Sequence, residues 1–429
     1  MNSSEYYKTV IDKIKNCFVN SGCAITIEKE LINAGFSKAF PIMRTLTDNL
    51  DYLTVQKGFQ VHLPVIGAGS QTVLCPMDFE IFLSEDQYKL YTNKETQKSY
   101  FKETIPAINF IKTIFIDRSM PFLLDFTPSG GHILFNVKLN HRSAVALMKI
   151  GFAEYGMVKS GQNYGITYEA MLTFSGVTRL AEYVALKTME AFKNNEREGK
   201  LPLTVSDSRE KCINIDNSWC EGAPHARSIR SPFSLHKKNI EKYGQYSQPP
   251  LVDVIGGTFD GKKLYCEADI DNVIECMWDL EKAGKWARNF DGFIPDANDS
   301  IIDFIEEYKQ TQLYQFHREF DATEDIPVGL ALQYAKHEQN IPEWAKSILY
   351  CPNPRALQPI NMKGFIYDFV IHAKWKPKHV ANILRDIYMD RSFGWVQDFK
   401  DSCPADEKAN FWVRTFASIA YWEKGYLKL

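Results

Sequence analysis

The spacing of apolar residues changes character twice along this chain of 429 residues. Residues 5–54 carry apolar side chains at helical spacing, whereas the following part mixes strand-like alternation with helical stretches. A segment rich in Gly and Pro, "GQYSQPPLVDVIGG", closes this mixed part, and the pattern after it is helical almost to the end. Mixed strands and helices followed by helices alone are typical of an α+β (mixed α/β) domain joined to an all-α domain. The sequence therefore predicts a helical lead-in over 1–58, a mixed domain over 59–257 and a helical domain over 268–429.

Composition and charge limit the classes of protein to which this chain can belong. Hydrophobic residues make up 45% of the chain and aromatic residues 13%, which suffices for large buried cores. Lys plus Arg number 50 against 53 for Asp plus Glu, so the chain is not the strongly basic body of a tight nucleic-acid binder, and any polyanion contact must be local. The cysteines are scattered without a CxxC pair, and no stretch approaches the roughly 20 apolar residues of a membrane span. We expect an intracellular, cytoplasmic protein without membrane contact.

The first stretch with possible chemistry is "PMDFEIFL", residues 76–83. Its alternation predicts a strand with three apolar side chains on one face and with Asp78 and Glu80 on the other, about 7 Å apart. Two carboxylates on one face of a strand can hold divalent cations. The alternative is a solvated strand face without a ligand.

The second stretch is "PSGGHILF", residues 128–135. Ser129, Gly130 and Gly131 predict a turn that offers a hydroxyl and bare backbone N–H groups to a phosphate, and His132 then points from the next strand into the same space. The alternative is a plain hairpin turn followed by a hydrogen-bonded strand histidine.

The third stretch spans residues 213–238 and begins with an apolar strand that ends at Asp216. Polar and basic residues follow, interleaved with apolar ones: Arg227, Arg230, Ser234, His236, Lys237 and Lys238. The interleaving favours a structured segment whose donors point one way, although such a run can also be a solvated charged face.

Within this stretch, "SIRSPFSLHKK" resembles the segment that follows the last catalytic aspartate in the small catalytic subunit of archaeal and eukaryotic DNA primases. The two earlier stretches stand in the order of that family's other motifs, so the chain resembles the archaeo-eukaryotic primase-polymerase superfamily, which includes the primase-polymerases of mobile elements, over roughly residues 60–250. The resemblance implies a primase-polymerase catalytic core in which Asp78, Glu80 and Asp216 are catalytic and bind two Mg²⁺ or Mn²⁺ ions.

The resemblance also implies the groups that hold the nucleotide. They are Ser129, Gly130, Gly131, His132, Arg230, Ser234, His236 and Lys237. Two departures stand out: the first motif is D-x-E where replicative primases carry D-x-D, and the "SGGH" turn lacks the arginines that those primases insert there. Because of the second departure, we expect Arg230, His236 and Lys237 to make most of the contacts to a triphosphate. Arg, Lys and His side chains suit the negative charge of a triphosphate.

The implied function is a template-directed primase-polymerase that starts and extends primers on single-stranded DNA from nucleoside triphosphates. The resemblance implies a replicative helicase or initiator as a partner, and a plasmid or virus is a candidate source of the protein. The C-terminal helices would hold the template or the initiating nucleotide. Three alternatives stay open: a gap-filling or repair polymerase that cannot start chains, a catalytically silent DNA-binding initiator, and, for the helices, a packing role alone.

Cysteine spacing does not favour further metal centres. Cys212, Cys220 and His225 are irregularly spaced and have no evident fourth ligand, so the sequence does not favour structural zinc. An iron–sulfur cluster is disfavoured as well, because the four remaining candidates are not closely spaced: Cys266, Cys276, Cys351 and Cys403.

Overall fold

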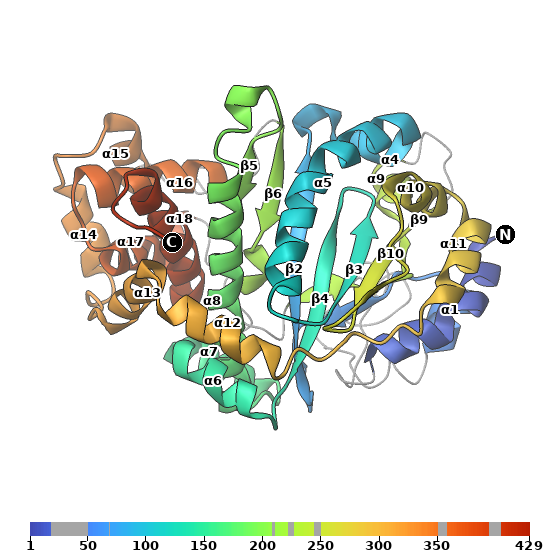
Figure 1. The fold of residues 1–429 in the computed structure, drawn as a ribbon. Coiled ribbons are helices and arrows are strands. Elements are labelled where there is room, and N and C mark those ends of the chain that lie inside the picture. Colours follow the sequence, from blue (N-terminus) through green and yellow to red (C-terminus); the bar gives the residue numbers. More distant parts are fainter. Residues whose placement is uncertain are drawn as a thin grey trace.

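A mixed sheet of seven strands lies at the centre of the protein (Figure 1). The computed structural model describes residues 1–18, 50–67, 69–207, 211–221, 227–243, 250–350, 358–393 and 405–429. The strand order is β11-β10-β3-β4-β2-β6-β5, and neighbouring strands are antiparallel except for the parallel pair β5–β6. The strands are β2 (Thr72–Phe82), β3 (Phe122–Thr127), β4 (Gly130–Lys138), β5 (Leu203–Val205), β6 (Cys212–Asp216), β10 (Val254–Phe259) and β11 (Leu264–Tyr265).

Two short antiparallel sheets accompany the large one, β1 with β7 and β8 with β9. Their strands are β1 (His62–Pro64), β7 (Ser228–Arg230), β8 (Leu235–His236) and β9 (Leu251–Val252). The remaining helices before residue 270 are α4 (Lys89–Thr92), α5 (Lys94–Ile116), α6 (Arg142–Ile150), α7 (Tyr155–Asn163), α8 (Tyr168–Ala191) and α9 (Lys238–Tyr243), after α1 (Ser3–Phe18) at the start. The predicted mixture of strands and helices is confirmed.

The long helices α5 and α8 cover one face of the sheet (Figure 1). Each begins at a residue whose side chain caps the first turn: Asn93 accepts a hydrogen bond from the N–H of Thr96, and Thr167 accepts one from the N–H of Ala170. On the covered face, the ring of Phe126 contacts those of Phe79 in β2 and Phe101 in α5. The predicted alternation of β2 therefore turns its apolar side chains toward the helices and leaves its carboxylates on the opposite face.

Gly130 and Gly131 lie within β4, which pairs with β2 on one side and with β3 on the other. A Cβ at Gly130 would stand 1.9 Å from the carbonyl oxygen of Phe79, and one at Gly131 would stand 2.4 Å from that of Asp125. The close approach of three strands thus requires both glycines. This differs from the expected open turn with free N–H groups, because the register draws the Gly-Gly pair into the sheet.

We predict that Gly131→Ala lowers the free energy of unfolding by at least about 2 kcal/mol, because the added methyl group cannot fit between the neighbouring strands. Gly257→Ala in β10 is the matched control, since its Cβ would meet its nearest neighbour at 3.4 Å, an ordinary contact. Urea unfolding of both variants measures the difference. Equal stabilities would show that the β4 backbone adjusts to the methyl group.

Two helices beyond residue 268 pack beside the sheet and α1 (Figure 1). They are α10 (Ile270–Trp278) and α11 (Leu280–Trp286). The indole N–H of Trp286 donates to the carbonyl of Ile255 at 2.8 Å, and that of Trp278 donates to the side chain of Gln97 in α5 at 2.6 Å. Among the described residues, the first two helices after residue 268 therefore pack mainly on the sheet, on α5 and on α1, rather than on the later helices of the expected helical domain.

The later helices form an all-helical region on the far side of α8 (Figure 1). They are α12 (Ser300–Lys309), α13 (Gln312–Ala322), α14 (Leu330–Lys336), α15 (Glu343–Tyr350), α16 (Pro359–Tyr367), α17 (Pro377–Met389) and α18 (Ala405–Glu423). The predicted C-terminal helical region is confirmed, with α17 and α18 largely buried at its centre. In the part of the chain that the structure describes, no helix combines the length and the apolar character that crossing a membrane demands.

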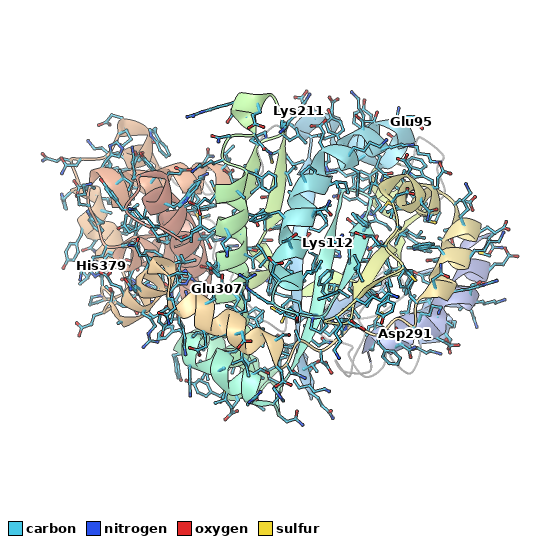
Figure 2. All side chains as sticks on the ribbon, in the orientation of Figure 1. Glu95, Lys112, Lys211, Asp291, Glu307 and His379 are labelled. Carbon is cyan, nitrogen blue, oxygen red and sulfur yellow. The ribbon has the colours of Figure 1, made fainter. Side chains whose placement is uncertain are left out.

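Buried ion pairs join this helical region to α8. Glu182 accepts hydrogen bonds from Arg414 of α18, with the Nε–Oε1 distance at 3.0 Å, and His317 Nε2 of α13 lies 3.0 Å from its other oxygen. At the α8–α12 crossing, Glu307 accepts a hydrogen bond from the Tyr183 hydroxyl at 2.8 Å (Figure 2). Because a buried charge is costly without its partner, the Glu182–Arg414 pair ties the two parts of the chain together, and the partly exposed Glu307 adds a hydrogen bond.

We predict that this junction is sensitive to acid. Burial raises the pKa of Glu182, but Arg414 and His317 more than offset it and hold that pKa well below its usual value. Burial lowers the pKa of His317 to about 4, despite the opposing influence of Glu182. The folded state therefore binds fewer protons than the unfolded state as the pH falls. Stability should decline from about pH 6.5 for His317 and further near pH 4.5 for Glu182.

Thermal unfolding between pH 3 and 8 tests this with Glu182→Gln, which should lose about 3 kcal/mol at neutral pH, keep the decline due to His317 and lack the further decline below about pH 4.5. Asp299→Asn is the control, since it breaks an exposed pair with Arg142. A wild-type pH profile identical to that of Glu182→Gln would contradict the assignment.

Candidate functional site

Three carboxylates from two adjacent strands share the face of the sheet opposite α5. The register pairs Asp78 of β2 directly with Asp216 of β6, and Glu80 follows two residues later on the same face. The sequence predicted all three as site residues, and the antiparallel pairing of β2 with β6 brings the third one to the first two. All three are partly exposed.

The row continues on the other side of β2 with His132 of β4 and Asp125 of β3, which the register places opposite one another. His132 Nδ1 lies 3.2 Å from Asp125 Oδ2, and its Nε2 lies 3.8 Å from Asp78 Oδ1. The side chain of Asp125 is 0% exposed, whereas that of Asp78 is 16% exposed. The row is therefore buried at its Asp125 end and accessible at Asp78.

After burial, repulsion between the carboxylates is the largest influence on the pKa values of Asp78 and Glu80. Burial raises the pKa of Asp78 well above its usual value, and the charges of Glu80 and Asp216 raise it further. Burial and Asp216 likewise raise the pKa of Glu80 to about 7, although Lys238 and Arg230 oppose the shift. Such clustering of negative charge is a property of sites that receive cations.

Positive charge reaches this cluster from the segment that contains β7 and β8. The Arg230 guanidinium opposes the raised pKa values of Asp78, Glu80 and Asp125, and its Nη1 lies 3.8 Å from Asp253 Oδ2. Lys238 Nζ stands over the ring of Tyr91 at 5.1 Å and also acts on Glu80. The expected candidate Lys237 instead stands over the ring of Phe59 at 5.9 Å.

The two histidines expected to bind nucleotide are both buried and held neutral. Burial, with Arg230 adding to it, lowers the pKa of His132 to about 3. Burial also lowers the pKa of His236, whose ring packs 5.4 Å from that of Tyr91. Neutral imidazoles each offer one donor and one acceptor nitrogen.

Two of the expected ligand residues, Ser234 and Ser129, are buried. The Ser234 hydroxyl is fully buried, accepts a hydrogen bond from the N–H of Val61 at 2.8 Å and donates one to the Leu235 carbonyl at 3.1 Å. Ser129 is also buried, and its carbonyl accepts a hydrogen bond from the N–H of Ile81 at 2.6 Å. Ser234 therefore offers no exposed hydroxyl to a ligand.

The N-terminal helix α1 holds the turn between Arg230 and His236. Phe233 adopts a positive φ of 65°, which a residue with a bulky side chain rarely takes without support. Tyr6 donates its hydroxyl to the Phe233 carbonyl at 3.0 Å. Tyr7 donates to the carbonyl of Phe59 at 2.6 Å and accepts from the N–H of Leu235 at 3.1 Å.

Three polar residues join the site without having been predicted: Asp125 and Asp253, which are buried, and His62, which is half-buried. Burial raises the pKa of both aspartates, and burial together with Arg230 lowers that of His62 to about 3. The signal in the sequence for the two aspartates is a single charged residue within an apolar segment, as in "FLLDFT" and "LVDVIGG". Such charges are rarely buried without a specific role.

Several polar atoms of this cluster lack a hydrogen-bond partner among the residues that the structure describes. They are His62 Nε2, Asp125 Oδ1, Arg230 Nε, His236 Nδ1 and both carboxylate oxygens of Asp253. Buried polar groups are normally satisfied, so their concentration at one place is a mark of a binding site. The donor set is mixed, with hard carboxylate oxygens beside guanidinium and imidazole nitrogens.

The carboxylates of Asp78, Glu80 and Asp216 fit a hard divalent cation chemically, since carboxylate oxygens are the ligands that Mg²⁺ and Mn²⁺ prefer. Within the described ranges, however, no three acidic, His or Cys side chains already form a group close enough to hold a metal ion. Of the residues considered as zinc ligands and not favoured for that role, Cys212 and Cys220 are buried free thiols, while His225 lies outside the described residues. Cys351 and Cys403 also lie outside them.

Comparisons with protein-family models, with curated proteins and with solved structures found no match to this chain.

We predict that Tyr7→Phe destabilises the protein by about 1–3 kcal/mol, because it leaves a buried N–H and a buried carbonyl without their partner. Tyr6→Phe is the matched variant: it removes one hydrogen bond and should cost less. Chemical denaturation compares the two. A larger loss for Tyr6→Phe would mean that the Phe233 carbonyl is the main anchor of the turn.

Proposed function

We propose that the protein is a template-directed nucleotidyltransferase, a primase-polymerase that makes and extends primers on single-stranded DNA. The observation that carries the proposal is the pairing of Asp78 with Asp216, which gathers three carboxylates on one face beside Arg230. The same three residues are those that the resemblance in sequence assigns to catalysis.

The carboxylates of Asp78, Glu80 and Asp216 would hold the divalent ions. All three side chains are partly exposed, and their neighbouring negative charges create a negative potential that attracts cations. When bound, Mg²⁺ or Mn²⁺ would make the attacking 3′-oxygen more nucleophilic and neutralise the leaving pyrophosphate. The carboxylates lie on paired strands of the central sheet, which favours precise positioning of the reacting groups.

The triphosphate would bind between the carboxylate face and the segment that carries Arg230. Arg230 keeps its Nε without a partner among the described residues, and its guanidinium can reach phosphate oxygens with two parallel hydrogen bonds. Lys238 adds a second positive charge near Glu80. The ring nitrogens of His132 and His236 supply neutral polar contacts from the buried side.

Binding of the template would depend on local contacts, because the net charge of the chain is −3. The attraction between the whole protein and DNA is therefore weak and sensitive to salt. A partner such as a helicase or an initiator could supply the missing affinity.

We predict that Asp78→Ala, Glu80→Ala and Asp216→Ala each lower nucleotide incorporation by on the order of a thousandfold or more, since each removes a ligand of the ions. The assay uses labelled nucleotides and Mn²⁺, with unprimed single-stranded DNA in one arm and a primed template in the other. Glu85→Ala is the control, because Glu85 is an exposed acid just beyond β2. Circular dichroism confirms that every variant is folded.

The two arms separate the competing functions. Activity in both arms supports a primase-polymerase, and activity with the primed template alone supports a gap-filling polymerase. Binding to DNA without incorporation in either arm supports a silent initiator. Incorporation by all three carboxylate variants at the wild-type rate would remove these residues from the site.

A further inference from the structure

Asp125 is a fully buried carboxylate that the proposed reaction does not use. It lies in β3, where all six residues are buried, and its side chain is 0% exposed. Its neighbours Leu124 and Phe126 face the helices, so Asp125 faces the site. A carboxylate at such a position is costly unless a specific contact compensates for it.

That contact is with His132. The two residues stand directly opposite one another in the register, and Asp125 Oδ2 lies 3.2 Å from His132 Nδ1. Asp125 Oδ1 has no hydrogen-bond partner among the described residues. The directional contact of the carboxylate is thus made to the imidazole, and an apolar side chain would serve the packing of β3 better.

The contact determines what the other ring nitrogen presents. In a neutral imidazole one nitrogen donates and the other accepts, so the group bonded to Nδ1 selects the tautomer and fixes the plane of the ring. His132 Nε2 then points toward Asp78, with 3.8 Å between Nε2 and Oδ1. This separation is too long for a hydrogen bond, which leaves Nε2 available to a ligand beside Asp78.

We propose that Asp125 is a positioning residue, which holds the His132 ring through Nδ1 and thereby presents Nε2 to the nucleotide beside Asp78. The part of this inference that concerns the nucleotide rests on the proposed function. The part that concerns the ring does not, because the hydrogen bond and its effect on the tautomer are properties of the protein alone.

Two substitutions that keep the branching at Cγ separate the hydrogen bond from the rest of the side chain. Asp125→Asn keeps a polar partner for Nδ1, whereas Asp125→Leu fills the space without one. Leu124→Ala is the control for general weakening of β3, since Leu124 is buried on the opposite face. All three variants are made in the full chain.

The first readout is the ¹⁵N spectrum of the histidine rings, with His132 assigned from the His132→Ala variant. We expect one tautomer of His132 in the wild type and in Leu124→Ala, and averaged signals of both tautomers in Asp125→Leu. Asp125→Asn should keep Nδ1 hydrogen-bonded, because the amide can either accept from this nitrogen or donate to it. Unchanged His132 signals in Asp125→Leu would overturn the proposal.

The second readout is the KM for nucleotide in primer extension. Asp125→Leu should raise KM about tenfold, the effect of one lost hydrogen bond, and Asp125→Asn by less than about threefold. In the His132→Ala background Asp125→Leu should add less than about a twofold change, because the residue acts through His132. Full additivity of the two substitutions would contradict the proposal. If the wild type incorporates no nucleotide, the proposed function fails and the ring spectrum still decides the role of Asp125.

Discussion

The antiparallel pairing of β2 with β4 and β6 is the constraint on which the rest of the structure depends. Side chains alternate along a strand, so one register sends Phe79 to the helices and Asp78 to the opposite face. A slip by one residue would put the carboxylates against α5 and the phenyl ring in the site. The same register places His132 and Asp216 on either side of Asp78. The same register therefore determines both the packing of the core and the position of the site residues.

The negative and positive charges around that face come from different parts of the fold. The carboxylates come from the central sheet, whereas Arg230 comes from a turn that α1 supports through Tyr6 and Tyr7. Phe233 in this turn has a left-handed backbone, a costly conformation that these hydrogen bonds can stabilise. The N-terminal helix is thus part of the scaffold of the site, although it carries none of its charged groups.

The helix α8 links the sheet to the helical region, because one side of it packs on strands and the other makes buried ion pairs. Glu182 and its partner Arg414 illustrate the link, and Trp286 of α11 makes a second one on the opposite side through Ile255. A truncation near Gly257 would fall within β10 and remove α10 and α11 from the sheet. A fragment that ends there would therefore lose packing contacts of the sheet as well as the C-terminal helices.

The sequence by itself determined the features that are properties of one segment: the two faces of β2, the mixed and then helical character of the chain, and the acidic and basic stretches that supply the candidate site. Only the tertiary structure decided which distant segments meet. It brought Asp125 to His132, gave Lys238 a position near Glu80, and drew Gly130 and Gly131 into the sheet. The physical reason is that periodicity reports the environment of a strand, whereas neighbours across strands depend on a register that is set by packing of the whole core.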